Sequence, residues 1–296
     1  MRWIDVINPG AKEIDYLKEN FKFGELDLTD ITSASQHAKF EEHGSHNTMV
    51  LLFPVFNKKT RVIRPAEVDF LIGTDYLLTI HDGSMYTMIR TFNNADENEE
   101  IRREYMGKNS GWLLYKVLES LFRRSFPLLD HISKDMNEIE SGIFSDIDVS
   151  MLEKISLMKT NIIDFRRITK THHLILKKLA ARKEPYMLFH ESKNYYLNLL
   201  EHSENIWDIL ATQKETMEAM QDANQSLATN RLNQITKVIT IFSGIFLPAT
   251  LILFIFGLNI DNMPLKTNPN AFWIILIIAA TASLCMLLFF KKKKWF

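Results

Sequence analysis

Uncharged polar side chains recur at steps of three and four residues between Ser226 and Gly257, a spacing that keeps them on one face of a helix. The stripe that they define reads Ser226, Thr229, Asn233, Thr236, Thr240, Ser243, Leu247, Thr250, Phe254 and Gly257. The oxygen atoms of Ser, Thr and Asn can hold a cation through its water shell, which suits Mg²⁺ because this ion sheds its waters reluctantly. The stripe therefore predicts a polar path for a hydrated divalent cation.

Acidic side chains continue the same stripe toward the N-terminus. This part of the stripe reads Glu201, Glu204, Asp208, Ala211, Glu215, Glu218 and Asp222. Several such helices around one axis would form a funnel that attracts cations and leads into a narrow pore. A single copy of a two-span chain cannot enclose a pore, so this interpretation requires a homo-oligomer.

The stripe also contains an apolar position. Leu247, with Ile239 close beside the stripe, could form a constriction that closes the pore by excluding water. Three other interpretations of the stripe stay open. Ser and Thr in membrane helices often bond back to the carbonyl four residues earlier, a polar stripe can pack against another helix, and an acidic stretch can be a solvated face.

Two charge-free segments place part of this stripe in a membrane. Residues 238–258 and 271–290 contain no Asp, Glu, Lys or Arg, and only Asp261 and Lys266 lie between them as charged residues. About 20 apolar residues cross a bilayer core of about 30 Å. We therefore predict two membrane helices, the first lining the pore, rather than a pair of buried core helices. The single Cys285 lies in the second segment, so an internal disulfide is excluded.

Basic residues at the ends of the two segments predict their orientation. Arg231 and Lys237 flank the first segment, and the tail 291–296 begins with Lys291, Lys292, Lys293 and Lys294. Because positive residues near span ends stay in the cytoplasm, we expect both termini there and an external loop at 259–270. The expected location is the plasma membrane, the inner membrane of a bacterium, where the lysines would form a basic collar.

The residues before the spans divide into two predicted cytoplasmic parts. Residues 1–105 are typical of an α/β domain, with strands at 48–56 and 67–81, and Gly73-Thr74-Asp75 marks a hairpin-like turn in the second run. Residues 106–237 are predicted to be helical and to include a stalk that leads into the membrane.

Three helices are expected in the second part. The first covers 112–144, interrupted by Pro127, and the second covers 151–183. Between Pro185 and Pro248 the chain has no proline and one glycine, so we expect one continuous helix of roughly 60 residues, about 90 Å long.

Several motifs resemble the CorA magnesium transporter family. Gly257-Leu258-Asn259 ends the first span, Met263-Pro264 follows it, and Phe246-Leu247-Pro248-Ala249-Thr250 precedes it. Asn233, Lys237 and Thr240 stand at the family's spacing, and the end KKKKWF also looks like that of the family. Since residues 68–82 resemble the family's N-terminal strand pair, the resemblance covers nearly the whole chain.

The resemblance implies Mg²⁺ uptake through a homopentamer that has a funnel-shaped cytoplasmic domain. Gly257, Leu258 and Asn259 would form the selectivity filter, with Asn259 as the outer ring that receives hydrated Mg²⁺. The deeper rings implied by the family pattern are polar at Asn233 and Thr250, apolar at Leu247, and acidic at Asp222 with Glu218 at the cytoplasmic mouth.

The resemblance also implies regulation by Mg²⁺, because family members close when this ion occupies acidic sites between neighbouring subunits. This chain has Asn198 where a sensing Asp is expected, and Glu201 and Glu204 are the acidic candidates close by. No organic cofactor is expected.

Two further departures concern the filter. Its central residue is Leu258 where the family usually has Met, and Leu265 stands where an acidic residue commonly follows Met-Pro. The external loop then holds only Asp261 and Lys266 as charged residues, which weakens the recruitment of cations.

Other functions stay open. Related members with other residues at the centre of the filter carry zinc or other divalent ions, so a Zn²⁺ transporter or a broad carrier of Co²⁺ and Ni²⁺ is the alternative. From another class, the chain could be a non-conducting scaffold anchored in the membrane. We expect no enzyme, because no nucleophile elbow, phosphate loop or catalytic triad is recognisable, and we expect no nucleic-acid partner.

Histidines suggest a separate zinc site only weakly. His37, His43 and His46 lie near two glutamates, but the segment lacks a helical His-x₃-His pair and any cysteine, which favours surface histidines. His172 and His173 are adjacent, so they cannot both face one site from a helix.

Overall fold

The computed structural model describes residues 1–21, 23–24, 38–43, 46–145, 149–181, 187, 192–258, 263–265, 267–293 and 295. Within them the chain forms two compact units, Met1–Gln221 and Asp222–Phe296, which are described in turn. Some residues that the sequence singles out lie outside the described part of the chain, namely His37, Asn259, Asp261, Lys266 and Lys294.

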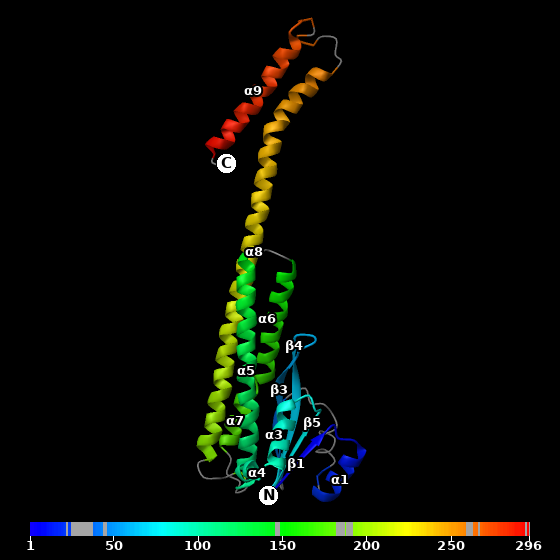
Figure 1. Ribbon diagram of the computed structural model, residues 1–296, viewed down its shortest axis with the longest axis vertical. Helices are drawn as coiled ribbons and strands as arrows, with labels where there is room; N and C mark the ends of the chain where they lie inside the picture. The colour runs from blue at the N-terminus through cyan, green and yellow to red at the C-terminus, as the bar shows by residue number, and fades with distance from the viewer. Residues whose placement is uncertain are drawn as a thin grey trace. The chain divides into compact units, whose positions relative to one another are not determined.

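The first unit is built on a five-stranded sheet with the order β1-β5-β4-β3-β2 (Figure 1). The strands are β1 (Arg2–Ile7), β2 (Lys39–Glu42), β3 (Asn47–Asn57), β4 (Val62–Ile72) and β5 (Tyr76–His81). β1 pairs with β5 in parallel, and the other pairs are antiparallel. The predicted turn at Gly73-Thr74-Asp75 is confirmed, since it joins β4 to β5 and the Gly73 amide donates to the Tyr76 carbonyl at 3.0 Å.

β3 and β4 continue beyond their neighbours as a two-stranded ribbon. Along β3, strand β2 pairs with residues 47–50, and along β4, strand β5 pairs with residues 68–72. In the ribbon Pro54 lies opposite Pro65. Proline has no N–H to donate to a sheet. It is tolerated in this ribbon because each strand there has one partner strand instead of two.

The sheet is covered on both faces because successive side chains of a strand alternate in direction. On one face Leu78 and Ile80 of β5 pack in one apolar cluster with Leu17 of α1. On the other face the Trp3 ring lies edge-on to Phe92 of α3, with ring centroids 5.1 Å apart.

Long helices complete the first unit. The helices up to the membrane segments are α1 (Ala11–Phe21), α3 (Tyr86–Glu97), α4 (Glu99–Met106), α5 (Ser110–Ser145), α6 (Val149–Thr169), α7 (His172–Ala180) and α8 (Ser192–Gly257). Asn161 of α6 holds the ribbon, because its side chain accepts from the Ile63 amide at 2.9 Å and donates to the Arg61 carbonyl at 2.8 Å.

Two of the helix predictions need correction. α5 runs through Pro127 without a break, so the predicted interruption is wrong. The single helix predicted over 151–183 is also wrong, because α6 ends at Thr169 and α7 begins at His172. At this junction His172 is buried and its Nε2 lies 2.8 Å from the Leu52 carbonyl of β3, a contact with the sheet that the local sequence does not reveal.

The predicted stalk helix is confirmed. α8 is one continuous helix of 66 residues that runs through Pro248. It belongs to the first unit up to Gln221 and to the second unit from Asp222 onward.

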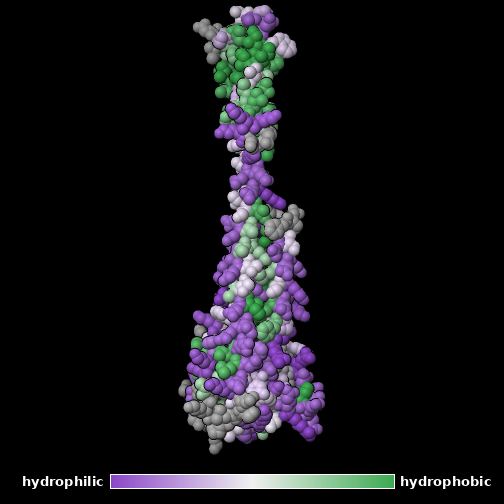
Figure 2. Space-filling view, turned by 90° about the vertical axis from the view of Figure 1, so that its left-hand side faces the viewer, coloured by the Kyte–Doolittle hydropathy of each residue, from purple (hydrophilic) through white to green (hydrophobic). Residues whose placement is uncertain are grey.

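The second unit consists of the C-terminal part of α8 and of α9 (Ala271–Lys292). Both helices are long and apolar enough to cross a membrane, and only 6% of each apolar window is buried. Figure 2 shows apolar side chains gathered over these helices. An exposed apolar surface of this extent is typical of a segment that contacts lipid.

Candidate ion pathway along helix α8

One face of α8 packs on the first unit through side chains spaced three and four residues apart. The buried residues on this face are Tyr196, Leu199, Ser203, Ile206, Leu210, Gln213, Met217 and Met220. Gln213 fixes the helix by donating to the Leu129 carbonyl at 3.0 Å and to the Ser133 hydroxyl at 2.9 Å. This face is therefore the seam between α8 and the rest of its own unit.

The acidic part of the stripe lies away from this seam. At about 100° per residue, its positions are centred roughly 140° around the helix from the buried ones. The exposed acidic residues are Glu201, Glu204, Asp208, Glu215 and Asp222, whereas Glu218 is half-buried. The acidic face thus points away from the body of its own unit.

The membrane part of the stripe is likewise opposite the face that packs on α9. Ile241 is buried there, the Ser283 hydroxyl of α9 donates to the Ile245 carbonyl at 3.0 Å, and a Cβ on Gly244 would lie 2.7 Å from the Phe290 ring. Stripe residues stand on the other side of the helix and are exposed, namely Asn233, Thr236, Thr240, Ser243, Leu247 and Thr250. In each unit, therefore, the residues of the stripe lie on an uncovered face of α8.

The threonine hydroxyls of the stripe bond back to the helix, as one of the open interpretations anticipated. Thr240 Oγ1 donates to the Thr236 carbonyl at 2.7 Å, and Thr250 Oγ1 donates to the Phe246 carbonyl at 2.8 Å. This bond uses the hydroxyl proton, so the exposed side of each oxygen presents lone pairs. Such an oxygen can accept a hydrogen bond from water.

The apolar positions predicted as a gate are also open to their surroundings. Leu247 is 66% exposed and Ile239 is 60% exposed. Within the described part of the chain, both side chains are therefore largely uncovered.

Two acidic residues of the stripe have basic neighbours. Glu204 Oε1 lies 3.3 Å from His173 Nδ1, so the two helices α7 and α8 meet at this candidate sensing residue. Glu218 accepts a hydrogen bond from Lys214 at 2.9 Å, which lowers the pKa of its carboxyl.

Only part of the predicted filter and collar falls in the described chain. A Cβ on Gly257 would meet no atom within 4 Å, and Leu258 is 41% exposed. Of the lysine collar, Lys291 and Lys292 form the last turn of α9 and Lys293 follows it.

The described histidines do not form a zinc site. The rings of His43 and His46 stack with centroids 5.0 Å apart, but His46 is buried against Phe23 rather than on the surface. Among the residues that the structure describes, no three His, Cys, Asp or Glu side chains come together as metal ligands would.

The contact of Gly244 with α9 and the contact of Ser283 with α8 were not predicted from the sequence. A signal for them was available, because small residues are common where two membrane helices pack closely.

Comparisons with known proteins bear on the family and the fold of the chain. A sequence model of the CorA-like Mg²⁺ transporter protein family matches residues 1–292. The cobalt/magnesium transport protein CorA of Thermotoga maritima is 24% identical over 298 residues, which cover 99% of this chain and 83% of that protein.

Two solved structures share the fold along nearly the whole chain. The complete structure of the CorA magnesium transporter from Methanocaldococcus jannaschii matches with a TM-score of 0.86 at 23% identity, covering 99% of this chain and 91% of that one. The full-length CmaX protein matches with a TM-score of 0.79 at 14% identity, covering 99% and 88%. Taken with the family match over residues 1–292, the chain belongs to the CorA-like Mg²⁺ transporter family.

Proposed function

We propose that this protein is a passive channel for divalent cations, that Mg²⁺ is its principal ion, and that a homopentamer forms the pore. One observation carries the proposal: the polar stripe of α8 occupies the exposed face that lies opposite both the seam with the first unit and the contact with α9. Five copies of that face around an axis would enclose a path lined by Thr, Ser and Asn oxygens. The family relationship supports the same assembly.

The ion would pass along the stripe in its hydrated form. Asn259 would receive it at the external end, and the oxygens of Thr250, Thr240 and Asn233 would hold its water shell on the way inward. The exposed acidic residues of α8 would then raise the local concentration of cations on the cytoplasmic side. Asp222 and Glu218 would form the ring at this mouth.

Closure would take place at the apolar ring. Leu247 and Ile239 would exclude water when the five helices approach one another. Cytoplasmic Mg²⁺ bound at Glu201 and Glu204 would favour the closed state. Flux through the Glu201→Gln/Glu204→Gln variant should then need a higher cytoplasmic Mg²⁺ concentration for half-inhibition, whereas Glu153→Gln on α6 should leave that concentration unchanged.

The membrane location and orientation follow from the charges at the span ends. Lys291–Lys293 at the end of α9 and Lys237 in α8 would lie on the cytoplasmic side of the plasma membrane. Both termini would then be cytoplasmic, and the loop 259–270 would be external.

The decisive experiment combines oligomeric mass with metal flux into liposomes. Asn259→Ala should abolish Mg²⁺ uptake and leave the pentamer intact, and unchanged flux in this variant would refute the pore. A monomer or dimer in detergent would instead support a non-conducting scaffold. Competition among Mg²⁺, Zn²⁺, Co²⁺ and Ni²⁺ in the same assay tests whether Leu258 in the filter shifts the preference away from Mg²⁺.

Accessibility of introduced thiols tests the pore face separately. Ser243→Cys in a Cys285→Ser background should react with a water-soluble cationic thiol reagent, and the reaction should block flux. The native protein is the matched control because its single Cys285 lies exposed on α9, away from the stripe. Block of the native protein by the same reagent would show that the readout does not report on the pore.

A further inference from the structure

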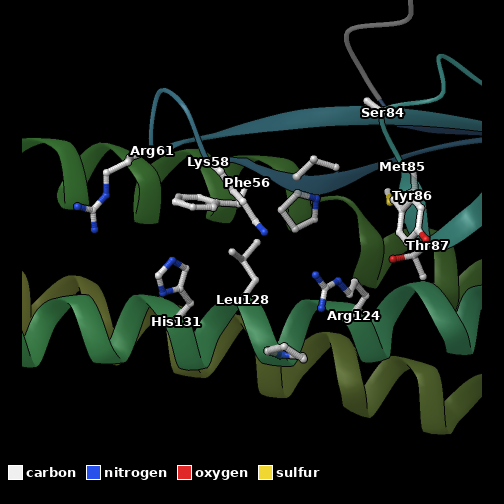
Figure 3. Close-up of a pocket in the computed structure, with 13 residues that line it drawn as sticks. Phe56, Lys58, Arg61, Ser84, Met85, Tyr86, Thr87, Arg124, Leu128 and His131 are labelled. Carbon is white, nitrogen blue, oxygen red and sulfur yellow. The ribbon is translucent and has the colours of Figure 1, made fainter.

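A cavity of about 770 Å³ opens in the first unit, away from the stripe of α8. It lies beneath the β3–β4 ribbon, with the middle of α5 on the other side and the loop that leads into α3 at one end (Figure 3). Its volume is within the range of about 300–1,000 Å³ that small-molecule sites occupy.

The lining of this cavity is positively charged. Lys58 and Arg61 come from the ribbon end, and Arg124 and His131 come from α5 (Figure 3). No Asp or Glu is among the described residues that line the cavity, although the whole chain has a net charge of −1. Such an arrangement concentrates positive potential in the cavity and selects anions.

Among Lys58, Arg61 and Arg124, two have no carboxylate of their own, and the fourth residue, His131, has its Nδ1 3.6 Å from Asp135 Oδ1. Arg61 pairs with Asp135 at 3.1 Å, but across the described part of the chain neither Lys58 nor Arg124 makes an ion pair. The neighbouring Arg123 shows the contrast, because it pairs with Glu119 at 3.2 Å outside the cavity. Lys58 and Arg124 are therefore free to bind an external anion.

The cavity also offers an apolar and aromatic surface. Phe56 lies edge-on to His131 with ring centroids 5.1 Å apart, and Tyr86 is 73% exposed at the other end of the cavity. An exposed aromatic ring is a platform on which a planar ring can stack. The hydroxyls of Ser84 and Thr87, which also line the cavity, add donors for an anion.

We infer that this cavity binds an organic polyphosphate of the nucleoside di- or triphosphate class. The phosphates would lie between Lys58 and Arg124, where charge-assisted hydrogen bonds are strong, and the base would stack on Tyr86. Arg61 would contribute less, because Asp135 already neutralises it. This site is independent of the proposed transport function.

The test measures the binding of ATP to the full-length protein in detergent by calorimetry. Divalent cations are removed with a chelator beforehand, so that metal stripping by the nucleotide adds no heat. We expect saturable binding with a Kd below about 1 mM. Lys58→Ala and Arg124→Ala should each weaken it about tenfold.

Matched controls stand directly beside both residues. Lys59→Ala and Arg123→Ala remove the same charges from positions that do not line the cavity, and they should leave the Kd unchanged. Absence of saturable ATP binding, or an equal loss in the control variants, would overturn the inference.

Two further ligands separate the phosphate from the base. Tripolyphosphate should compete with ATP, and adenosine should bind far more weakly than ATP because it lacks the phosphates. Tyr86→Ala should weaken ATP but not tripolyphosphate. If tripolyphosphate binds as tightly as ATP and Tyr86→Ala changes neither, the site takes inorganic polyphosphate and the assignment to nucleotides is wrong.

Discussion

Gly244 of α8 lies directly against the Phe290 ring of α9, so close that a Cβ on the glycine would come within 2.7 Å of the ring. Phe290 is itself only 7% exposed. The contact holds α9 on one side of α8 and leaves the polar stripe uncovered on the other side.

A larger side chain at Gly244 should therefore loosen the membrane unit. Overpacking of this kind costs about 1–3 kcal/mol, so Gly244→Leu should lower the thermal stability of the oligomer in detergent. The double variant with Phe290→Ala should recover part of the loss, because the two sites are in direct contact. Strictly additive effects of the two substitutions would show that the contact does not exist.

The position of the stripe oxygens, and not their hydrogen bond to the helix, should determine their contribution to Mg²⁺ flux. Thr250→Val keeps the shape but removes the oxygen, and we expect Mg²⁺ flux to fall about tenfold. Thr281→Val on α9 is the matched control, since Thr281 makes the same bond to the Ile277 carbonyl at 2.8 Å but lies off the stripe. Equal losses in both variants would indicate a structural role for these threonines.

The apolar ring should control leakage. If the proposed gate exists, Leu247→Ser would let water enter the closed constriction, so we expect flux to persist at cytoplasmic Mg²⁺ concentrations at which the native protein would close. Leu251→Ser changes another exposed leucine of the same helix, at a position off the stripe, and should leave closure intact. Fluorescent Mg²⁺ indicators inside proteoliposomes give both curves.

His172 should make the first unit sensitive to acid. Burial lowers the pKa of its imidazole to about 4, although the contact with the Leu52 carbonyl works in the opposite direction. The folded state therefore keeps His172 neutral below pH 6.5, where the unfolded chain takes up a proton. The stability that this residue contributes is complete above pH 6.5 and is lost as the pH falls from there toward 4.

From pH 7.5 to pH 5 the loss should be about 2 kcal/mol in free energy of unfolding. His172→Gln keeps a donor for the Leu52 carbonyl but cannot be protonated, so its stability should fall less over this interval. Chemical denaturation of both proteins at the two pH values measures the difference. Identical pH dependence would mean that His172 is not held neutral in the fold.

The sequence was sufficient to predict elements whose signal lies within one segment of the chain and does not depend on tertiary contacts. The charge-free segments, the uninterrupted stretch that became α8 and the turn at residues 73–75 all follow from composition and from proline and glycine placement. The stripe was also visible, because a spacing of three and four residues depends on the helix alone.

Tertiary contacts decided what the sequence left open. Whether the stripe was buried or exposed depended on which faces of α8 meet α9 and the first unit, and only the contacts of Gln213, Ile245 and Gly244 determine this. The break before His172 and the burial of His46 have the same origin, since both imidazoles pack in the first unit. Pro127 was misjudged because a long helix that packs along its length can tolerate one missing hydrogen bond.

The paired prolines of the β3–β4 ribbon have a consequence for assembly. Pro54 and Pro65 face each other where the ribbon has outgrown both neighbouring strands, so this rung offers no amide proton to either side. A strand from another molecule therefore cannot accept a backbone hydrogen bond from the ribbon at this position. The paired prolines therefore disfavour edge-to-edge pairing of the ribbon with another strand at this position.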